Sequence, residues 1–303
     1  MKIQANGISL EVEDSGGSGP AVLLVMGLGM QLIAWPEAFV RGFADAGYRV
    51  LRHDNRDIGL SQYFDEAPTP NLLWQVLRQK MGLSIHAPYG LEDMARDALG
   101  LLEALGIAQA HVIGVSMGGM IAQRMAIADP QRVRSLVSIM SSSGARGLPA
   151  ARPDVGAALM RPPPRGAGVE ALVEHSLGLV RLIASPGYPF DEAATRQRLA
   201  AALQRAYHPA GVVRQMLAIG ADTGVRDRAL AGIRTPTLVL HGDGDVLVPI
   251  ECGRDTARRI PGAHFETIAG MGHDLPPGAL PVLLGHILPF LQAVDGRPPA
   301  HNF

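Results

Sequence analysis

Cysteine is nearly absent from this chain, which has only Cys252 among its 303 residues. A single cysteine excludes a disulfide bond within the chain. It also excludes a structural zinc site built on several thiolates. We therefore expect a fold that is held together by its core and not by covalent or metal cross-links.

The sequence also has no excess of charge of one sign and no long apolar run. The 27 Lys and Arg balance 28 Asp and Glu, and no basic cluster indicates a nucleic-acid surface. The longest apolar stretch, residues 21–35, is interrupted by Gly27, Gly29 and Gln31 and is too short to span a bilayer. The first residues lack the apolar segment of a signal peptide. We expect a cytoplasmic protein whose partner is neither a nucleic acid nor a membrane.

The chain does contain an alternation of strand-like and helix-like segments. Alternating apolar residues around Asn6-Gly7 predict an N-terminal hairpin. Short apolar runs predict buried strands, and amphipathic segments between them predict helices. The predicted strands are 21–25, 48–52, 111–115, 133–139, 237–241 and 264–268, and the predicted helices are 36–46, 72–79, 91–105, 117–128 and 278–293. This order is typical of an α/β fold with a mostly parallel, doubly wound sheet.

Strand character is missing from about residue 144 to residue 224, where the chain is helix-like and interrupted by Pro162–Pro164. We interpret residues 143–225 as a helical cap inserted into the sheet, with the proline run as its linker. Residues 1–142 and 226–303 then form the α/β core. The length of the chain suits a core of this type with an inserted cap.

Ser116 lies between Gly114 and Gly118, where a predicted strand meets a predicted helix. A tight strand-to-helix turn needs glycines because its backbone segments approach closely. Such a turn raises the serine hydroxyl above the sheet and directs a helix N-terminus at the site. The G-x-S-x-G pattern also occurs by chance, so the alternative is a glycine-rich turn with an incidental serine. The strand and helix on either side favour Ser116 as a nucleophile.

A nucleophilic serine needs a base, and the base needs an orienting carboxylate. In a doubly wound sheet these groups lie on loops after later strands. His273 follows the last predicted strand in a glycine-rich loop and is the predicted base. Asp243 and Asp245 both follow the strand 237–241, and Asp243 can instead be a turn residue. A calcium loop is the other interpretation of this pair, but the further oxygen ligands at regular spacing are missing.

Acyl transfer also needs two backbone N–H groups directed at the developing oxyanion. Met117, directly after the candidate nucleophile, supplies one of them. The turn 26–29 after the first buried strand contains two glycines, and we assign its donor to Leu28. The alternative is that this segment is a plain strand-to-helix turn.

Three motifs together resemble the α/β-hydrolase superfamily. They are the segment 114–119, the segment 241–249 with Asp245 and Val248-Pro249, and Gly272-His273. They occur in the order of that family and span nearly the whole chain outside the cap. The resemblance implies an α/β-hydrolase fold in which Ser116, Asp245 and His273 form a catalytic triad.

Two further segments refine the resemblance. Residues 54–61 resemble the turn that follows the family's fourth strand, which is usually structural. Met26-Gly27 differs from the commoner His-Gly start of the oxyanion loop. Together with residues 54–57, it is similar to the branch that contains aclacinomycin methylesterase. In that branch the residue after Met-Gly supplies an oxyanion N–H, which implies Leu28 here.

The substrate pocket is predicted from residues near the catalytic loops in sequence. Methionines adapt to varied apolar groups, and the cap is expected to cover the site and exclude water. The alternative is that most of these side chains belong to the core. Residues 62–90 are interpreted as a second wall of the pocket, with His86 and Tyr89 as polar contacts. The predicted pocket residues are therefore Met26, Gly27, Trp35, His86 and Tyr89.

These features predict a serine carboxylesterase that cleaves small to medium apolar or aromatic esters through an acyl-enzyme, with no metal and no cofactor. The same triad also supports acyl transfer, including transfer to peroxide, and hydrolysis of amide or carbon–carbon bonds. A ligand-binding receptor on a hydrolase scaffold is an alternative of a different class. The dehalogenases and epoxide hydrolases of the superfamily use an aspartate nucleophile, and Ser116 argues against both.

Overall fold

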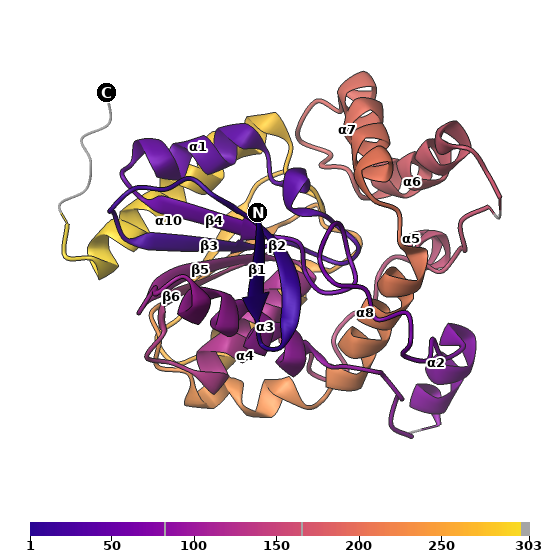
Figure 1. Ribbon diagram of the computed structural model, residues 1–303, viewed down its shortest axis with the longest axis horizontal. Coiled ribbons are helices and arrows are strands. Elements are labelled where there is room, and N and C mark those ends of the chain that lie inside the picture. Colours follow the sequence, from indigo (N-terminus) through magenta and orange to yellow (C-terminus); the bar gives the residue numbers. More distant parts are fainter. Residues whose placement is uncertain (82, 165, 298–303) are drawn as a thin grey trace.

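A computed structural model describes residues 1–81, 83–164 and 166–297. Arg165 of the predicted cap and residues 298–303 of the predicted core lie outside the described residues. An eight-stranded sheet lies at the centre with helices on both faces, and a further group of helices lies beyond one side of it (Figure 1).

The sheet has the strand order β1-β2-β4-β3-β5-β6-β7-β8. β1 pairs antiparallel with β2, β2 pairs antiparallel with β4, and every later pairing is parallel. The mostly parallel sheet and the N-terminal hairpin are therefore confirmed, and the predicted buried strands agree with the structure to within one residue at each end. The strands are β1 (Lys2–Ala5), β2 (Ile8–Asp14), β3 (Ala21–Val25), β4 (Arg49–His53), β5 (Ala110–Val115), β6 (Val133–Ile139), β7 (Thr237–Gly242) and β8 (His264–Ile268).

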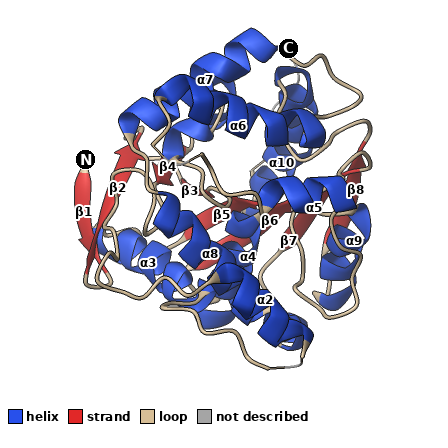
Figure 2. Ribbon diagram, turned by 90° about the vertical axis from the view of Figure 1, so that its right-hand side faces the viewer, coloured by secondary structure: helices blue, strands red, loops and turns tan. Residues whose placement is uncertain are grey.

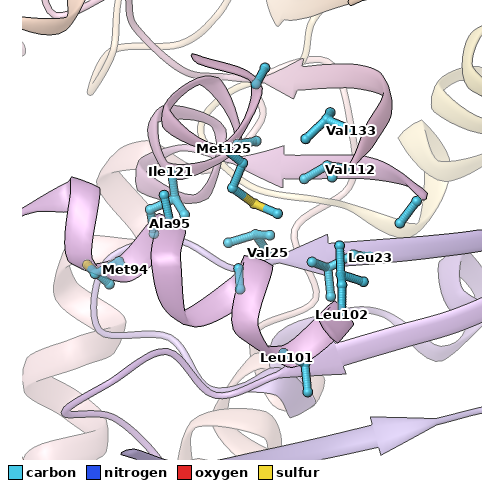
Figure 3. Close-up of a cluster of buried hydrophobic side chains, with 14 of the residues drawn as sticks. Leu23, Val25, Met94, Ala95, Leu101, Leu102, Val112, Ile121, Met125 and Val133 are labelled. Atoms are coloured by element: carbon cyan, nitrogen blue, oxygen red, sulfur yellow. The ribbon is translucent and has the colours of Figure 1, made fainter. Parts of the chain in front are cut away.

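Helices cover both faces of the sheet because parallel strands need crossover connections. On one face, α3 (Leu91–Ala104) and α4 (Met117–Ala128) pack on Leu23, Val25 and Val112, as Figure 3 shows. On the other face lie α1 (Glu37–Asp45) and α10 (Leu280–Val294). β3, β5 and β7 are consequently buried along their whole length. This burial accounts for the unbroken apolar sequence of β3 and for the mostly apolar sequences of β5 and β7. α9 (Ile250–Arg259) packs against β7 and β8.

One segment of the described chain, Pro277–Val294, is long and apolar enough to cross a membrane by length and composition alone. It comprises α10 and the 3₁₀ turn before it. Leu283, Ile287 and Leu291 of this helix are fully buried in the core beside α1. This packing explains the apolar residues on the core face of α10, and 33% of the segment is buried.

Between β6 and β7 the described chain forms helices and no strand. These are α5 (Pro153–Leu159), α6 (Val169–Ile183), α7 (Glu192–Arg205) and α8 (Pro209–Asp222), followed by two 3₁₀ turns. Figure 2 views the molecule from the side on which they lie, with the sheet behind them. α2 (Leu72–Lys80) packs against α8 and lies outside the central layers.

Candidate active site

Ser116 occupies the turn between β5 and α4. Its φ is +54° and its ψ is −121°, a strained conformation for a residue with a side chain. Backbone contacts hold it there, because its N–H donates to the Ile139 carbonyl over 2.9 Å. The Ser141 hydroxyl donates to the Ser116 carbonyl over 2.7 Å. Ser116 is therefore held by main-chain bonds to the neighbouring β6 region while its side chain stays partly exposed.

The glycines around Ser116 are required by close backbone contacts. A Cβ atom at Gly114 would lie 2.1 Å from the Gly118 carbonyl oxygen. A Cβ atom at Gly118 would lie 2.0 Å from the carbonyl oxygen of Val25. Backbone atoms in the sheet cannot move aside cheaply, so both positions exclude any side chain. The G-x-S-x-G pattern is thus a steric consequence of β3, β5 and α4 meeting at one point.

His273 lies between the two other candidate groups. Its Nε2 is 3.0 Å from Ser116 Oγ. Its Nδ1 is 2.7 Å from Asp245 Oδ2. Asp245 follows β7 and His273 follows β8, so the carboxyl ends of three parallel strands bring together groups that are far apart in sequence. This arrangement can pass a proton from the serine hydroxyl to the imidazole and hold the resulting imidazolium against a carboxylate.

Asp245 is held as an ionised carboxylate. Its side chain is fully buried, and its Oδ1 accepts the N–H groups of Leu247 and Val248 over 2.9 and 2.8 Å. Burial alone would raise the pKa of Asp245. The charge of His273 and hydrogen bonds from His241, His273 and the Val248 N–H outweigh burial and hold this pKa well below its usual range. Asp245 therefore remains negative when His273 becomes positive.

Asp243 is the second candidate from the sequence for the carboxylate that orients the base, and it lies in a different position from Asp245. Its side chain is exposed, and its Oδ1 accepts the Gly270 N–H over 2.6 Å. Asp243 thus ties the loop before His273 to the loop after β7. The structure places it in a turn role and brings Asp245, not Asp243, to the imidazole.

The turn 26–29 lies directly beside Ser116. A Cβ atom at Gly27 would lie 3.2 Å from Ser116 Cβ. The Met26 carbonyl accepts a 2.9 Å hydrogen bond from Asn55 Nδ2, and the Gly29 N–H donates to Gln215 Oε1 over 2.9 Å. Leu28 lies between these two fixed points.

Met117 is the first residue of α4, so its N–H has no carbonyl partner within the helix. The Met117 N–H and the N–H of Leu28 come from the two segments that flank Ser116 Oγ. These segments are the start of α4 and the turn 26–29. Together they can offer two donors to a negative oxygen that develops beside Ser116.

A segment after α6 holds the His273 loop. The His273 N–H donates to the Ile183 carbonyl over 2.8 Å, and the Gly272 N–H donates to Ser185 Oγ over 2.8 Å. The Ser185 hydroxyl donates in turn to Asp274, whose pKa is raised by burial. Sequence reasoning missed Ser185, because no motif marks it and its partners lie almost 90 residues away.

The predicted pocket residues divide into two groups. Met26 and Gly27 lie in the turn beside Ser116, as described above. Trp35 is 1% exposed and stacks on Phe39 with ring centroids 5.5 Å apart, within the core on the α1 side of the sheet. This contact favours the alternative interpretation, in which Trp35 is a core residue.

Tyr89 and His86 also have neighbours other than the triad. Tyr89 is buried in the core on the α3 side, against Phe64 and the guanidinium of Arg56. His86 Nε2 lies 3.0 Å from an Arg78 nitrogen near α2. The described contacts bring neither residue to Ser116.

The described residues contain no group of three or more His, Cys, Asp or Glu side chains placed to hold a metal ion. Cys252 is buried, and burial raises the pKa of its thiol to about 11. The thiol is therefore protonated near neutral pH and is a weak nucleophile. Ser116 combines a partly exposed side chain with an imidazole nitrogen within hydrogen-bonding distance.

Comparison with known proteins agrees with this fold. A family model described as the alpha/beta hydrolase fold matches residues 20–165. A rhodomycin D methylesterase from Streptomyces sp. (strain C5) is 31% identical in an alignment 274 residues long that covers 84% of this chain and 85% of that protein. A 2-hydroxy-6-oxononadienedioate/2-hydroxy-6-oxononatrienedioate hydrolase from Paraburkholderia phymatum is 27% identical over 90% of this chain and 88% of that protein.

Among solved structures, a meta-cleavage product hydrolase from Pseudomonas fluorescens IP01 superposes with a TM-score of 0.75 over 97% of each chain. Its sequence is only 18% identical, so this similarity concerns the fold alone. The fold expected from the sequence motifs is thereby confirmed.

Proposed function

This chain belongs to the α/β-hydrolase family, and from that premise we propose that it is a carboxylic ester hydrolase that works through a covalent acyl intermediate on Ser116. The observation that carries the proposal is the hydrogen-bonded chain from Asp245 through His273 to Ser116 Oγ. The similarity to a methylesterase over most of both chains supports ester cleavage.

In the first half-reaction, Ser116 Oγ attacks the ester carbonyl carbon while His273 Nε2 accepts the hydroxyl proton. The carbonyl oxygen becomes negative and is stabilised by the N–H groups of Leu28 and Met117. The ionised Asp245 stabilises the imidazolium and fixes its tautomer. Collapse of the intermediate breaks the bond to the alcohol, which leaves with the proton from His273.

In the second half-reaction, a water molecule attacks the acyl-enzyme. His273 takes a proton from this water, and the same N–H groups stabilise the second oxyanion. The proton then returns to Ser116 Oγ as the carboxylic acid leaves. No step requires a metal or an organic cofactor, since the proton moves only among water, the alcohol, His273 and Ser116.

We propose that residues 143–225 act as a cap above the site and that the substrates are small to medium apolar or aromatic esters. Contacts of the segment support the first part, because Ile183 and Ser185 bond to the His273 loop and Gln215 bonds to the turn 26–29. The methionines at 26, 117 and 120, on the two segments that flank Ser116, support an apolar site, because methionine adapts to varied apolar groups.

Hydrolysis of a carbon–carbon bond is the second candidate function. It is favoured by the similarity to a hydrolase of 2-hydroxy-6-oxo dienoic acids over 90% of this chain. Such a substrate would need the same triad and oxyanion donors but releases a carbon leaving group. If the protein turns over a 2-hydroxy-6-oxodienoate faster than it turns over any ester, carbon–carbon bond hydrolysis is favoured over the proposed ester hydrolysis.

A panel of p-nitrophenyl esters with graded acyl chains tests the proposal. We expect turnover of short to medium chains, and Ser116→Ala should lower kcat by about three to six orders of magnitude. Ser176→Ala, on the outer helix α6, is the matched control and should retain wild-type turnover. A folded wild-type protein that hydrolyses no ester in the panel would contradict the proposed function.

A further inference from the structure

Gln215 on α8 is a fully buried polar side chain that contacts two core loops. Its Oε1 accepts the N–H of Gly29 over 2.9 Å, and its Nε2 donates to the Arg56 carbonyl over 2.9 Å. The two ends of the amide thus face a donor and an acceptor. Among side chains of this size, only a group with both an acceptor and a donor satisfies both partners.

Gly29 is the last residue of the turn 26–29, and α8 holds it in two ways. Besides the hydrogen bond from Gly29 to Gln215, Val212 covers the residue, since a Cβ atom at Gly29 would lie 3.2 Å from Val212 Cγ2. Gly29 has φ +68°, which glycine adopts without strain. At the opposite end of the turn, Asn55 fixes the Met26 carbonyl. The core therefore holds one end of the turn, and α8 holds the other.

We propose that Gln215 is a positioning residue that orients the Leu28 N–H toward the oxyanion when α8 is docked on the core. The inference rests on the proposed ester hydrolysis at Ser116. The Leu28 N–H belongs to the Gly27–Leu28 peptide unit, whose Gly27 carbonyl accepts the Met30 N–H over 3.3 Å. Gln215 holds the next peptide unit through the Gly29 N–H. Loss of that hydrogen bond frees rotation about the backbone bonds of Leu28 and lets its N–H turn away from the oxyanion. An oxyanion donor is useful only when it points at the developing charge, and loss of one donor lowers kcat by about 10²–10³-fold.

The neighbouring Arg214 shows how docking of α8 and assembly of the oxyanion hole are coupled. Its guanidinium binds both carboxylate oxygens of Asp57 over 2.7 and 2.8 Å, and both side chains are buried. Asp57 and Arg56 lie on the same loop after β4. Arg214 and Gln215 are consecutive residues of α8. When Arg214 binds Asp57, Gln215 is therefore brought to Gly29 at the same time.

The test replaces Gln215 by methionine, which has a similar volume and no hydrogen-bonding amide. We expect Gln215→Met to lower kcat by about 10–100-fold with KM changed less than threefold. Affinity for a trifluoromethyl ketone, whose hemiketal oxygen occupies the oxyanion position, should fall by the same factor as kcat/KM. A purely structural role would instead lower the melting temperature and leave kcat per folded molecule unchanged, which would overturn the proposal.

His208→Gln is the matched control. His208 also joins α8 to the core, but it contacts the Asp57 carbonyl and the Asp65 carboxylate and does not contact the turn 26–29. This variant should keep kcat and ketone affinity within about twofold of wild type. An equal loss in His208→Gln would show that general docking, not Gln215, sets the rate, and would overturn the proposal.

Gln215→Glu provides a second variant and a pH readout. Burial raises the pKa of a carboxyl at this position, and its protonated form keeps both an acceptor for Gly29 and a donor for Arg56. The ratio of its kcat to that of wild type should therefore rise toward low pH. A ratio that does not change with pH would contradict the assigned hydrogen bonds.

Hydrogen–deuterium exchange separates this inference from the proposed function. The amide of Gly29 should exchange faster in Gln215→Met than in wild type and in His208→Gln. This measurement needs no substrate, so it tests the positioning role even if no ester is hydrolysed. Unchanged exchange at residues 26–30 in Gln215→Met would overturn the inference and leave the proposed function untouched.

Discussion

At the scale of single residues, the two carboxylates after β7 have opposite surroundings. Asp245 is buried, ionised and hydrogen-bonded to His273. Asp243 is exposed and accepts the Gly270 N–H. The proposed mechanism assigns the orienting charge to Asp245 alone.

The assignment predicts different effects for two matched substitutions. Asp245→Asn should lower kcat for p-nitrophenyl esters by about 10⁴-fold, because a neutral amide neither stabilises the imidazolium nor fixes its tautomer. Asp243→Asn should retain activity within about tenfold, because its carboxamide oxygen still accepts the Gly270 N–H. If Asp243→Asn inactivates the enzyme and Asp245→Asn does not, the acid is misassigned.

The structure brings Ser116 and His273, both predicted from the sequence, within hydrogen-bonding distance, because each follows a strand in a glycine-rich loop. Trp35 and Tyr89 show the limit of sequence analysis. A pocket position was predicted for Trp35 from its proximity in sequence to the catalytic loops, and for Tyr89 from a second pocket wall at residues 62–90. The structure buries them in the cores on opposite faces of the sheet. The direction of a side chain from a loop depends on packing partners that are distant in sequence, which local patterns do not contain.

At the scale of elements, the β5–Ser116–α4 unit fits only if its turn stays free of side chains. Gly118 packs against the end of β3, where a Cβ atom would lie 2.0 Å from the Val25 carbonyl oxygen. The turn therefore joins three elements of the core with no space left at this point.

Gly118→Ala should destabilise the protein by about 3 kcal/mol or more in urea unfolding, because the added methyl group meets backbone atoms. Gly178→Ala, on the exposed side of α6, is the matched control. Nothing lies within 4 Å of its Cβ position, and alanine should stabilise it by up to about 1 kcal/mol. A Gly118→Ala protein as stable as wild type would contradict the close packing of this turn.

The strands and helices of the core could be predicted because they form short apolar runs or amphipathic periods, and glycine or proline lies beside several of them. α4 and β6 begin and end at the predicted residues. The contacts of the helical segment between β6 and β7 could not be predicted. Gln215 meets Gly29 across 186 residues, and nothing in either local sequence indicates the other.

At the scale of the whole molecule, buried ion pairs join the segment 143–225 to the loop after β4. Arg205 at the end of α7 binds Asp54 over 2.7 Å, and Arg214 binds Asp57. Burial alone would raise the pKa of Asp57. Hydrogen bonds from Arg214 and the Phe64 N–H outweigh burial and lower it. Docking of the helical segment is therefore linked to the ionisation of a buried carboxylate.

This linkage predicts how stability depends on pH. A carboxylate whose pKa is lower in the folded state stabilises the fold above its unfolded pKa of about 3.9 and loses that contribution as pH falls through the folded pKa. The advantage of wild type over Asp57→Asn, about 3–5 kcal/mol at pH 7, should therefore shrink below about pH 4. Urea unfolding of both proteins across this range measures it, and an advantage that does not change with pH would contradict the ionised pair.

The central claim is that Ser116 carries the acyl group, and trapping that intermediate tests it most directly. Wild-type protein mixed with p-nitrophenyl acetate should be quenched in acid within the first turnovers, digested and analysed by mass spectrometry. We predict a 42 Da acetyl adduct on the peptide that contains Ser116, absent in Ser116→Ala and strongly reduced in His273→Ala. Turnover with no adduct on Ser116, or with the acetyl group on another residue, would contradict the account.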